Sequence, residues 1–114
     1  MRDIDNLIYL KTDVKSGEED SINYEDVVFF TSSGITGTYT NEKTFGVICD
    51  DASGETKRAV AIYGTVEASL SSDTFFDGVL VVYSTLNDYF KLATTNANGI
   101  YIRGKIYIFD NRIY

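Results

Sequence analysis

The stretch that decides the fold is residues 45–70, FGVICDDASGETKRAVAIYGTVEASL. It holds two apolar runs, residues 45–49 and 59–66, on either side of an acidic turn that contains Gly54. In the second run the even-numbered positions from Val60 to Val66 point one way and the odd-numbered positions point the other, which predicts a strand with one face in a core. Asp, Ser and Gly favour turns. We therefore predict a two-strand unit around which the rest of the chain is arranged.

Length and composition extend this prediction to the whole chain. The 114 residues are enough for one domain with its own core. Apolar residues make up 44% of the chain and aromatic residues 14%, and there is no proline. Abundant Tyr, Phe, Val, Ile and Thr favour strands, and no stretch has a sustained helical stripe. The sequence predicts an all-β single-domain barrel or sandwich of about eight short antiparallel strands with little or no helix.

The chain divides into two segments in this prediction. Residues 1–20 form an N-terminal arm or edge strand, with the apolar run Leu7, Ile8, Tyr9 and Leu10 between charged flanks. Residues 21–114 form the barrel or sandwich. An arm of this kind could add a strand to the open sheet edge of a neighbouring molecule, where backbone hydrogen bonds supply affinity.

Two local patterns predict the secondary structure near the C-terminus. Asn98-Gly99 is a strong hairpin pattern because both residue types tolerate positive φ, and it predicts a turn between residues 91–94 and 100–102. Residues 103–109 then form the last strand, with Gly104 inside it.

Most catalytic groups are missing from the sequence. There is no His and only one Cys, so a Ser-His-Asp triad, a Cys-His pair and a zinc knuckle are excluded. No phosphate-binding glycine loop is present. Asp50, Asp51 and Glu55 could bind calcium, but their spacing does not match an EF-hand, and a solvated turn is the simpler interpretation. We predict a protein that is not an enzyme and that needs no cofactor or metal.

Charge and hydropathy limit the partners. The net charge of −7 repels nucleic acid. No apolar run reaches the roughly 18 residues of a membrane-spanning helix. The N-terminus has no secretory signal, so synthesis in the cytoplasm is expected. The expected partners are proteins, and the contact residues that we predict are Leu7, Ile8, Tyr9, Leu10, Phe75, Phe76 and Tyr114. Alternatively, Phe75 and Phe76 plug one end of the barrel.

The central stretch resembles the small capsid decoration (cement) proteins of tailed bacteriophages. The family pattern Gly-Val, then Asp-Ala-Ser and Gly-Glu, matches residues 46–55, and the strand that ends near residue 66 follows it. Residues 76–83, 90–99 and 102–105 look like the second half of that family. The base module of phage head fibres is similar. The resemblance covers residues 26–105.

The resemblance implies an auxiliary capsid protein that binds an assembled shell and stabilises it. It also implies a virion location, contact with the major capsid protein and neighbouring virion proteins, and a trimer or an array. A phage neck, tail or head-fibre base component is the alternative within the same class. A ligand- or carbohydrate-binding β-barrel is the alternative of another class, because nine Tyr could supply stacking platforms.

Overall fold

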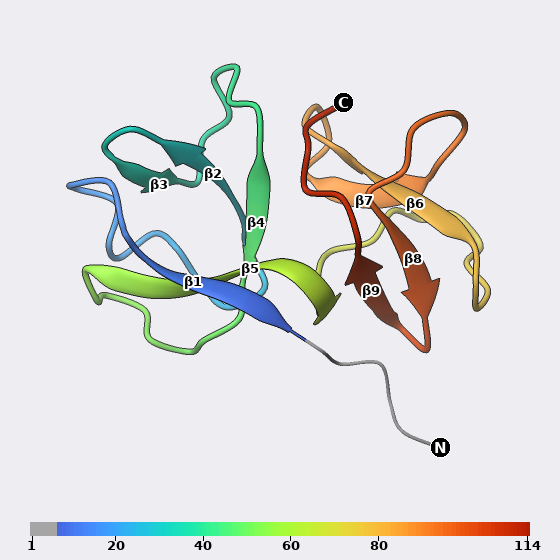
Figure 1. Ribbon diagram of the computed structural model, residues 1–114, viewed down its shortest axis with the longest axis horizontal. Helices are drawn as coiled ribbons and strands as arrows, with labels where there is room; N and C mark the ends of the chain where they lie inside the picture. Colours follow the sequence, from blue (N-terminus) through green and yellow to red (C-terminus); the bar gives the residue numbers. More distant parts are fainter. Residues whose placement is uncertain (1–6) are drawn as a thin grey trace.

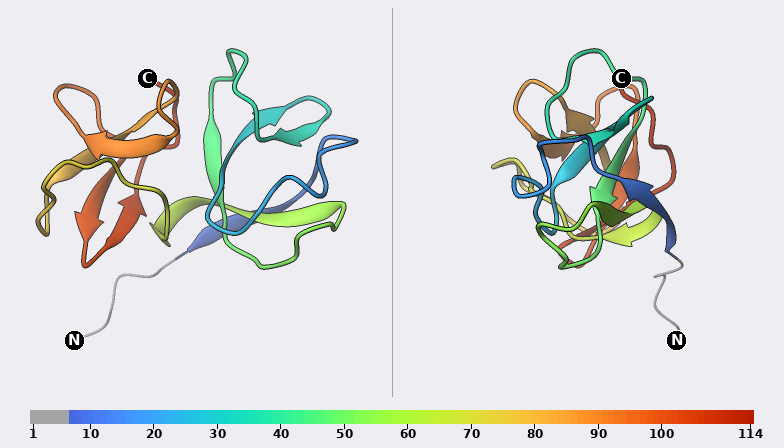
Figure 2. Two further views of the ribbon diagram at one scale, coloured as in Figure 1. Left: turned by 180° about the vertical axis from the view of Figure 1, so that it is seen from behind. Right: turned by 90° about the vertical axis from the view of Figure 1, so that its left-hand side faces the viewer.

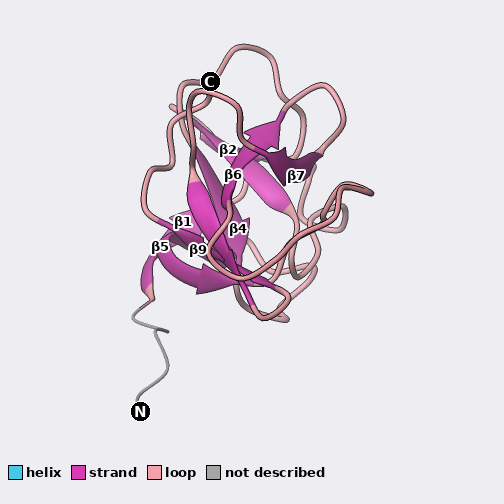
Figure 3. Ribbon diagram, turned by 90° about the vertical axis from the view of Figure 1, so that its right-hand side faces the viewer, coloured by secondary structure: helices cyan, strands magenta, loops and turns pink. Residues whose placement is uncertain are grey.

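Nine antiparallel strands form between residues 7 and 114, the part of the chain that the computed structural model describes. In chain order they are β1 (Ile8–Asp13), β2 (Val27–Thr31), β3 (Gly34–Thr36), β4 (Phe45–Ile48), β5 (Lys57–Val66), β6 (Leu80–Ser84), β7 (Tyr89–Leu92), β8 (Gly99–Ile102) and β9 (Lys105–Ile108). No residue in this part is helical (Figure 1, Figure 3). The predicted all-β single domain is confirmed.

All nine strands belong to one strongly curled sheet, a half-barrel. The order is β3-β2-β4-β5-β9-β8-β6-β7, and β1 pairs with β5 beside this path. Figure 2 shows strands β1–β5 and β6–β9 as two curved groups, with the end of β5 reaching from one group to the other.

The long strand β5 is the centre of the sheet, as the opening stretch of the sequence predicts. β4 pairs with it through Val47↔Ala61 and Ile48↔Val60. β1 pairs with the first part of β5, and β9 pairs with its last three residues. Three strands therefore depend on the register of this one strand.

The predicted alternation along β5 is broken at Ile62. Val60 packs in one buried cluster, whereas Ala61 and Val66 both pack in the other, although they lie five positions apart. Strict alternation would place Ala61 and Val66 on opposite faces. β1 pairs Ile8 with Tyr63 and Tyr9 with Ala61, so Ile62 is the extra residue of a β-bulge, and the facing of the side chains shifts there.

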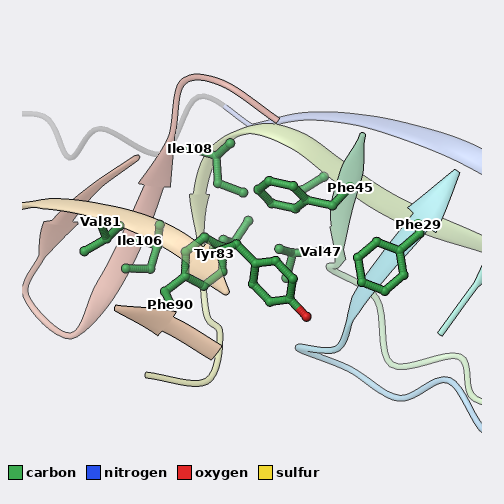
Figure 4. Packing of buried hydrophobic residues seen from close by; sticks show 10 residues of the cluster. Phe29, Phe45, Val47, Val81, Tyr83, Phe90, Ile106 and Ile108 are labelled. Carbon is green, nitrogen blue, oxygen red and sulfur yellow. The ribbon is translucent and has the colours of Figure 1, made fainter. Parts of the chain in front are cut away.

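The two buried clusters lie on the two sides of β2, β4 and β5. The larger cluster joins the two groups of strands through aromatic rings: Phe45 stacks on Tyr83 with centroids 5.5 Å apart, and Phe90 meets both rings edge-on (Figure 4). The smaller cluster fills the curl of β1–β5 and includes Ile22, Ile35 and Val60. Burying each such side chain contributes about 1.5–3 kcal/mol.

The predicted hairpin at Asn98-Gly99 does not form. β7 and β8 do not pair with each other, because each lies on one side of β6. The Asn98 side chain is buried and bonds to distant backbone: its Oδ1 accepts from Tyr83 N at 2.8 Å, and its Nδ2 donates to the carbonyls of Asp110 at 2.9 Å and Arg112 at 2.7 Å. Tertiary bonds replace the local turn.

The tight turn forms at Arg103-Gly104 instead. Both residues have positive φ, +49° and +84°, and Ile102 pairs with Lys105 across the turn. This matches a two-residue hairpin whose twist suits its strands. The predicted strand over residues 103–109 therefore shortens to β9, and Gly104 belongs to the turn.

Candidate functional site

The strand β1 carries the first predicted contact residues. One edge of β1 pairs with β5, and no described strand pairs along its other edge. The exposed fractions are 54% for Ile8, 57% for Tyr9 and 46% for Leu10, and Leu7 precedes them in an exposed position. The first six residues of the predicted arm lie outside the described part of the chain. The structure thus brings this predicted group together on an open strand edge.

Phe75 and Phe76 have different surroundings. The Phe75 ring stacks on Tyr101 at 5.2 Å and packs against the larger cluster. Phe76 is 64% exposed, in the loop before β6. Phe76 is therefore the member of the pair that a partner could reach.

Tyr114 lies well away from β1, at the end marked C in Figure 1. Its hydroxyl donates to the Asp110 carboxylate, and the Arg112 guanidinium lies 5.4 Å from its ring centre. Arg112 also forms an ion pair with Asp110 at 3.0 Å. Hydrogen bonds from Arg112, and then from Tyr114, lower the pKa of Asp110 to about 2 despite its partial burial. The exposed Tyr ring borders a shallow hollow that also includes Leu86 and Lys91.

The acidic turn between β4 and β5 has a structural role. The carboxylate of Asp50 accepts from Arg58 Nε at 2.7 Å and from the backbone N–H of Ala59 at 2.8 Å. Arg58 is fully buried and also donates to the Ile22 carbonyl. Burial raises the pKa of Asp50, but the bonds from Ala59 and Arg58 outweigh burial and lower it. Over residues 7–114 no three Cys, Asp or Glu side chains gather closely enough to hold a metal ion.

The single thiol, Cys49, is half-buried beside this turn. Its Sγ donates to the carbonyl of Ala59 at 3.4 Å. Burial raises the pKa of the thiol, and the neighbouring Asp50 adds to this effect. The nucleophilic thiolate is therefore disfavoured.

Sequence reasoning missed one surface, the outer side of β6, β8 and β9. Leu80, Ile100 and Tyr107 lie side by side there as cross-strand partners. The neighbouring positions Val81 and Ile106 belong to the larger cluster on the inner side. A sequence pattern could have indicated this surface, because residues 80–83 and 100–102 are apolar at every position. Strands apolar on both faces are typical of sheets that are covered on both sides.

No protein-family model matches this chain, and no match was found among the curated proteins or the solved structures. Within residues 7–114 there is no helix that could span a membrane. The fold and the exposed apolar surfaces are therefore the features of this chain that bear on its function.

Proposed function

We propose that this chain is a virion structural protein, an auxiliary decoration protein that binds and stabilises the assembled head of a tailed bacteriophage. The resemblance of residues 26–105 to that class is its first support. The observation that carries the proposal is the open edge of β1 with three consecutive exposed apolar side chains, Ile8, Tyr9 and Leu10. Proteins normally protect such edges, because an unpaired apolar strand recruits another strand.

Binding at this edge requires no chemical reaction. A strand from the shell would bond to the free backbone groups of β1, and its side chains would pack on Tyr9 and Leu10. Many copies on one lattice make weak single contacts cumulative. The polar groups already described, the Asp50–Arg58 pair and the Asn98 amide, stabilise the fold and lie outside the exposed apolar residues 8–10 of β1.

Cosedimentation with assembled shells, with phage tails and without any particles tests the proposal. We expect native protein to sediment with shells, and Tyr9→Ser to bind about tenfold more weakly, because apolar anchors dominate such contacts. Tyr39→Ser is the matched control, since Tyr39 is also exposed but lies between β3 and β4. Thermal unfolding verifies that both variants are folded.

Three outcomes would change the assignment. Binding to tails and not to shells would assign the protein to the neck or tail. A specific carbohydrate bound in the absence of particles would favour the ligand-binding alternative. Failure to bind any particle component would overturn the proposal.

A further inference from the structure

Asn98 and Gly99 form the one Asn-Gly pair in the sequence. In a flexible chain such a pair is chemically unstable, because the backbone nitrogen of the glycine attacks the side-chain amide carbon, Cγ, of the asparagine. The attack closes a succinimide ring and releases ammonia. Glycine favours this reaction because it has no side chain to hinder the approach and leaves the backbone free to rotate. The lifetime of the Asn98 amide therefore depends on how tightly the fold holds it.

The fold fixes both the side chain and the backbone of Asn98. The side chain is fully buried, and its amide makes three hydrogen bonds to distant backbone groups at 2.7–2.9 Å. The backbone N–H donates to the carbonyl of Val81 at 2.8 Å, and the backbone carbonyl accepts from the N–H of Phe109 at 3.0 Å. Ring closure needs rotation about the Cα–C bond of Asn98 to bring the nitrogen of Gly99 to Cγ. That rotation would turn the carbonyl away from Phe109, so the hydrogen bonds oppose it.

The packing of the sheet explains why an unstable pair stands at this position. Gly99 lies in β8 between two strands and pairs with Val81 on one side and Ile108 on the other. A Cβ at Gly99 would lie 2.5 Å from the carbonyl oxygen of Tyr107, so a larger residue would force the strands apart. The side chain of Asn98 must donate and accept at the same time, which an amide does. The fold uses both residues of the pair.

We propose that Asn98 is a site of spontaneous deamidation that is closed in the folded protein and open in the unfolded chain. In the unfolded chain the nitrogen of Gly99 forms a bond to Cγ of Asn98. Nδ2 leaves as ammonia, and it carries away the proton that the nitrogen of Gly99 gives up through water. Water then opens the ring at either carbonyl and leaves aspartate or isoaspartate at residue 98. The reaction needs water alone, and no oxidant or reductant takes part.

The product does not fit the folded site. Aspartate places a carboxylate oxygen where the amide of Asn98 donates to the carbonyls of Asp110 and Arg112, and a carboxylate has no proton to donate. Burying an unpaired charge against two carbonyl oxygens is strongly unfavourable. Isoaspartate adds a methylene group to the backbone and displaces the side chain. Each modified chain is therefore lost from the folded population, and unfolding becomes irreversible with time. This inference does not rest on the proposed function.

Incubation of the full chain at neutral pH over a series of guanidinium chloride concentrations tests the inference. Trypsin then releases residues 92–103, which contain both Asn98 and Asn96, and mass spectrometry locates the modified residue. We expect the rate of modification at Asn98 to follow the fraction of unfolded protein. Without denaturant the rate should be at least about a hundredfold lower than in the fully unfolded chain. Asn96, which alanine follows, is the internal control and should keep its amide over the same time.

Two variants separate the site from its protection. Gly46→Ala, in β4, should shift the unfolding curve and the curve of modification rate along the denaturant axis by the same amount. Asn98→Gln should abolish the modification in the unfolded chain, because a glutamine side chain closes a ring on the next nitrogen far more slowly. Whether Asn98→Gln folds does not affect this result, since the chain is unfolded throughout the measurement.

Three results would overturn the inference. One is modification of Asn98 without denaturant at a rate less than about a hundredfold below that of the unfolded chain. Another is a mass change in residues 92–103 that persists in Asn98→Gln. The third comes from removing the denaturant after partial modification: we expect unmodified chains to refold and modified chains to stay unfolded, and recovery of the native fold by modified chains would contradict this.

Discussion

Asp50 and Arg58 lie at the two ends of the turn between β4 and β5 and form an ion pair, with Arg58 Nε 2.7 Å from Asp50 Oδ1. The guanidinium is fully buried and the carboxylate is one-fifth exposed. Asp50→Ala would leave a buried positive charge without its partner. We expect a loss of about 3–5 kcal/mol in the free energy of unfolding, measured by urea denaturation. The exposed neighbour Asp51→Ala is the control, and a loss below about 1 kcal/mol for Asp50→Ala would contradict the prediction.

The lowered pKa values predict the acid sensitivity of the fold. Asp50 and Asp110 both have pKa values below the ordinary range when folded, about 2 for Asp110, whereas an unfolded Asp has a pKa of about 3.9. Their contribution is therefore complete above pH ~4 and is lost as the pH falls towards about 2. We expect urea unfolding at a series of pH values to show this loss, and Asp110→Asn to show a smaller one. If Asp110→Asn loses as much stability between about pH 4 and pH 2 as the native protein does, Asp110 is not a source of the acid sensitivity.

The buried hydrogen bonds of the Asn98 amide predict that replacing this one side chain lowers the stability of the fold considerably. Asn98→Ala leaves the N–H of Tyr83 and the carbonyls of Asp110 and Arg112 without this partner. Because a buried unsatisfied polar group costs about 1–3 kcal/mol, we expect a loss of at least about 2 kcal/mol. Asn96→Ala, at an exposed position of the same loop, should change stability by less than about 0.5 kcal/mol. Similar unfolding curves for the two variants would count against the structural role of Asn98.

The close packing around Gly46 in β4 predicts a steric clash if a larger residue replaces it. A Cβ at this position would lie 2.2 Å from Val60 Cγ1 and 3.0 Å from the carbonyl oxygen of Ala61. We expect Gly46→Ala to lower the melting temperature and cost about 1–3 kcal/mol, because the core must shift to accept the methyl group. Gly37→Ala is the matched control, since its Cβ would have no neighbour closer than 3.9 Å. A melting temperature as high as that of the control would show that β4 and β5 are not packed this closely.

Local patterns predicted the class of fold and its central pair of strands. Residues 45–49 and 59–66 are apolar, rich in strand formers and separated by a turn, and β4 and β5 form there. The exposed apolar run at residues 7–10, where β1 begins, was also predictable, because a short apolar run between charged flanks suits an edge. The outer side of β6, β8 and β9 was not identified, since the consecutive apolar residues at 80–83 and 100–102 do not say which side remains uncovered.

The amino-acid sequence by itself determined that this chain is all-β, with Lys57–Val66 at its centre and few groups able to carry out covalent chemistry. Tertiary structure alone decided the facing of Val66, the site of the last hairpin and the burial of Arg58. The physical reason is that these features depend on groups far apart in the chain. The bulge at Ile62 depends on the pairing of β5 with the distant strand β1, and Asn98 bonds to backbone groups 12 to 15 residues away.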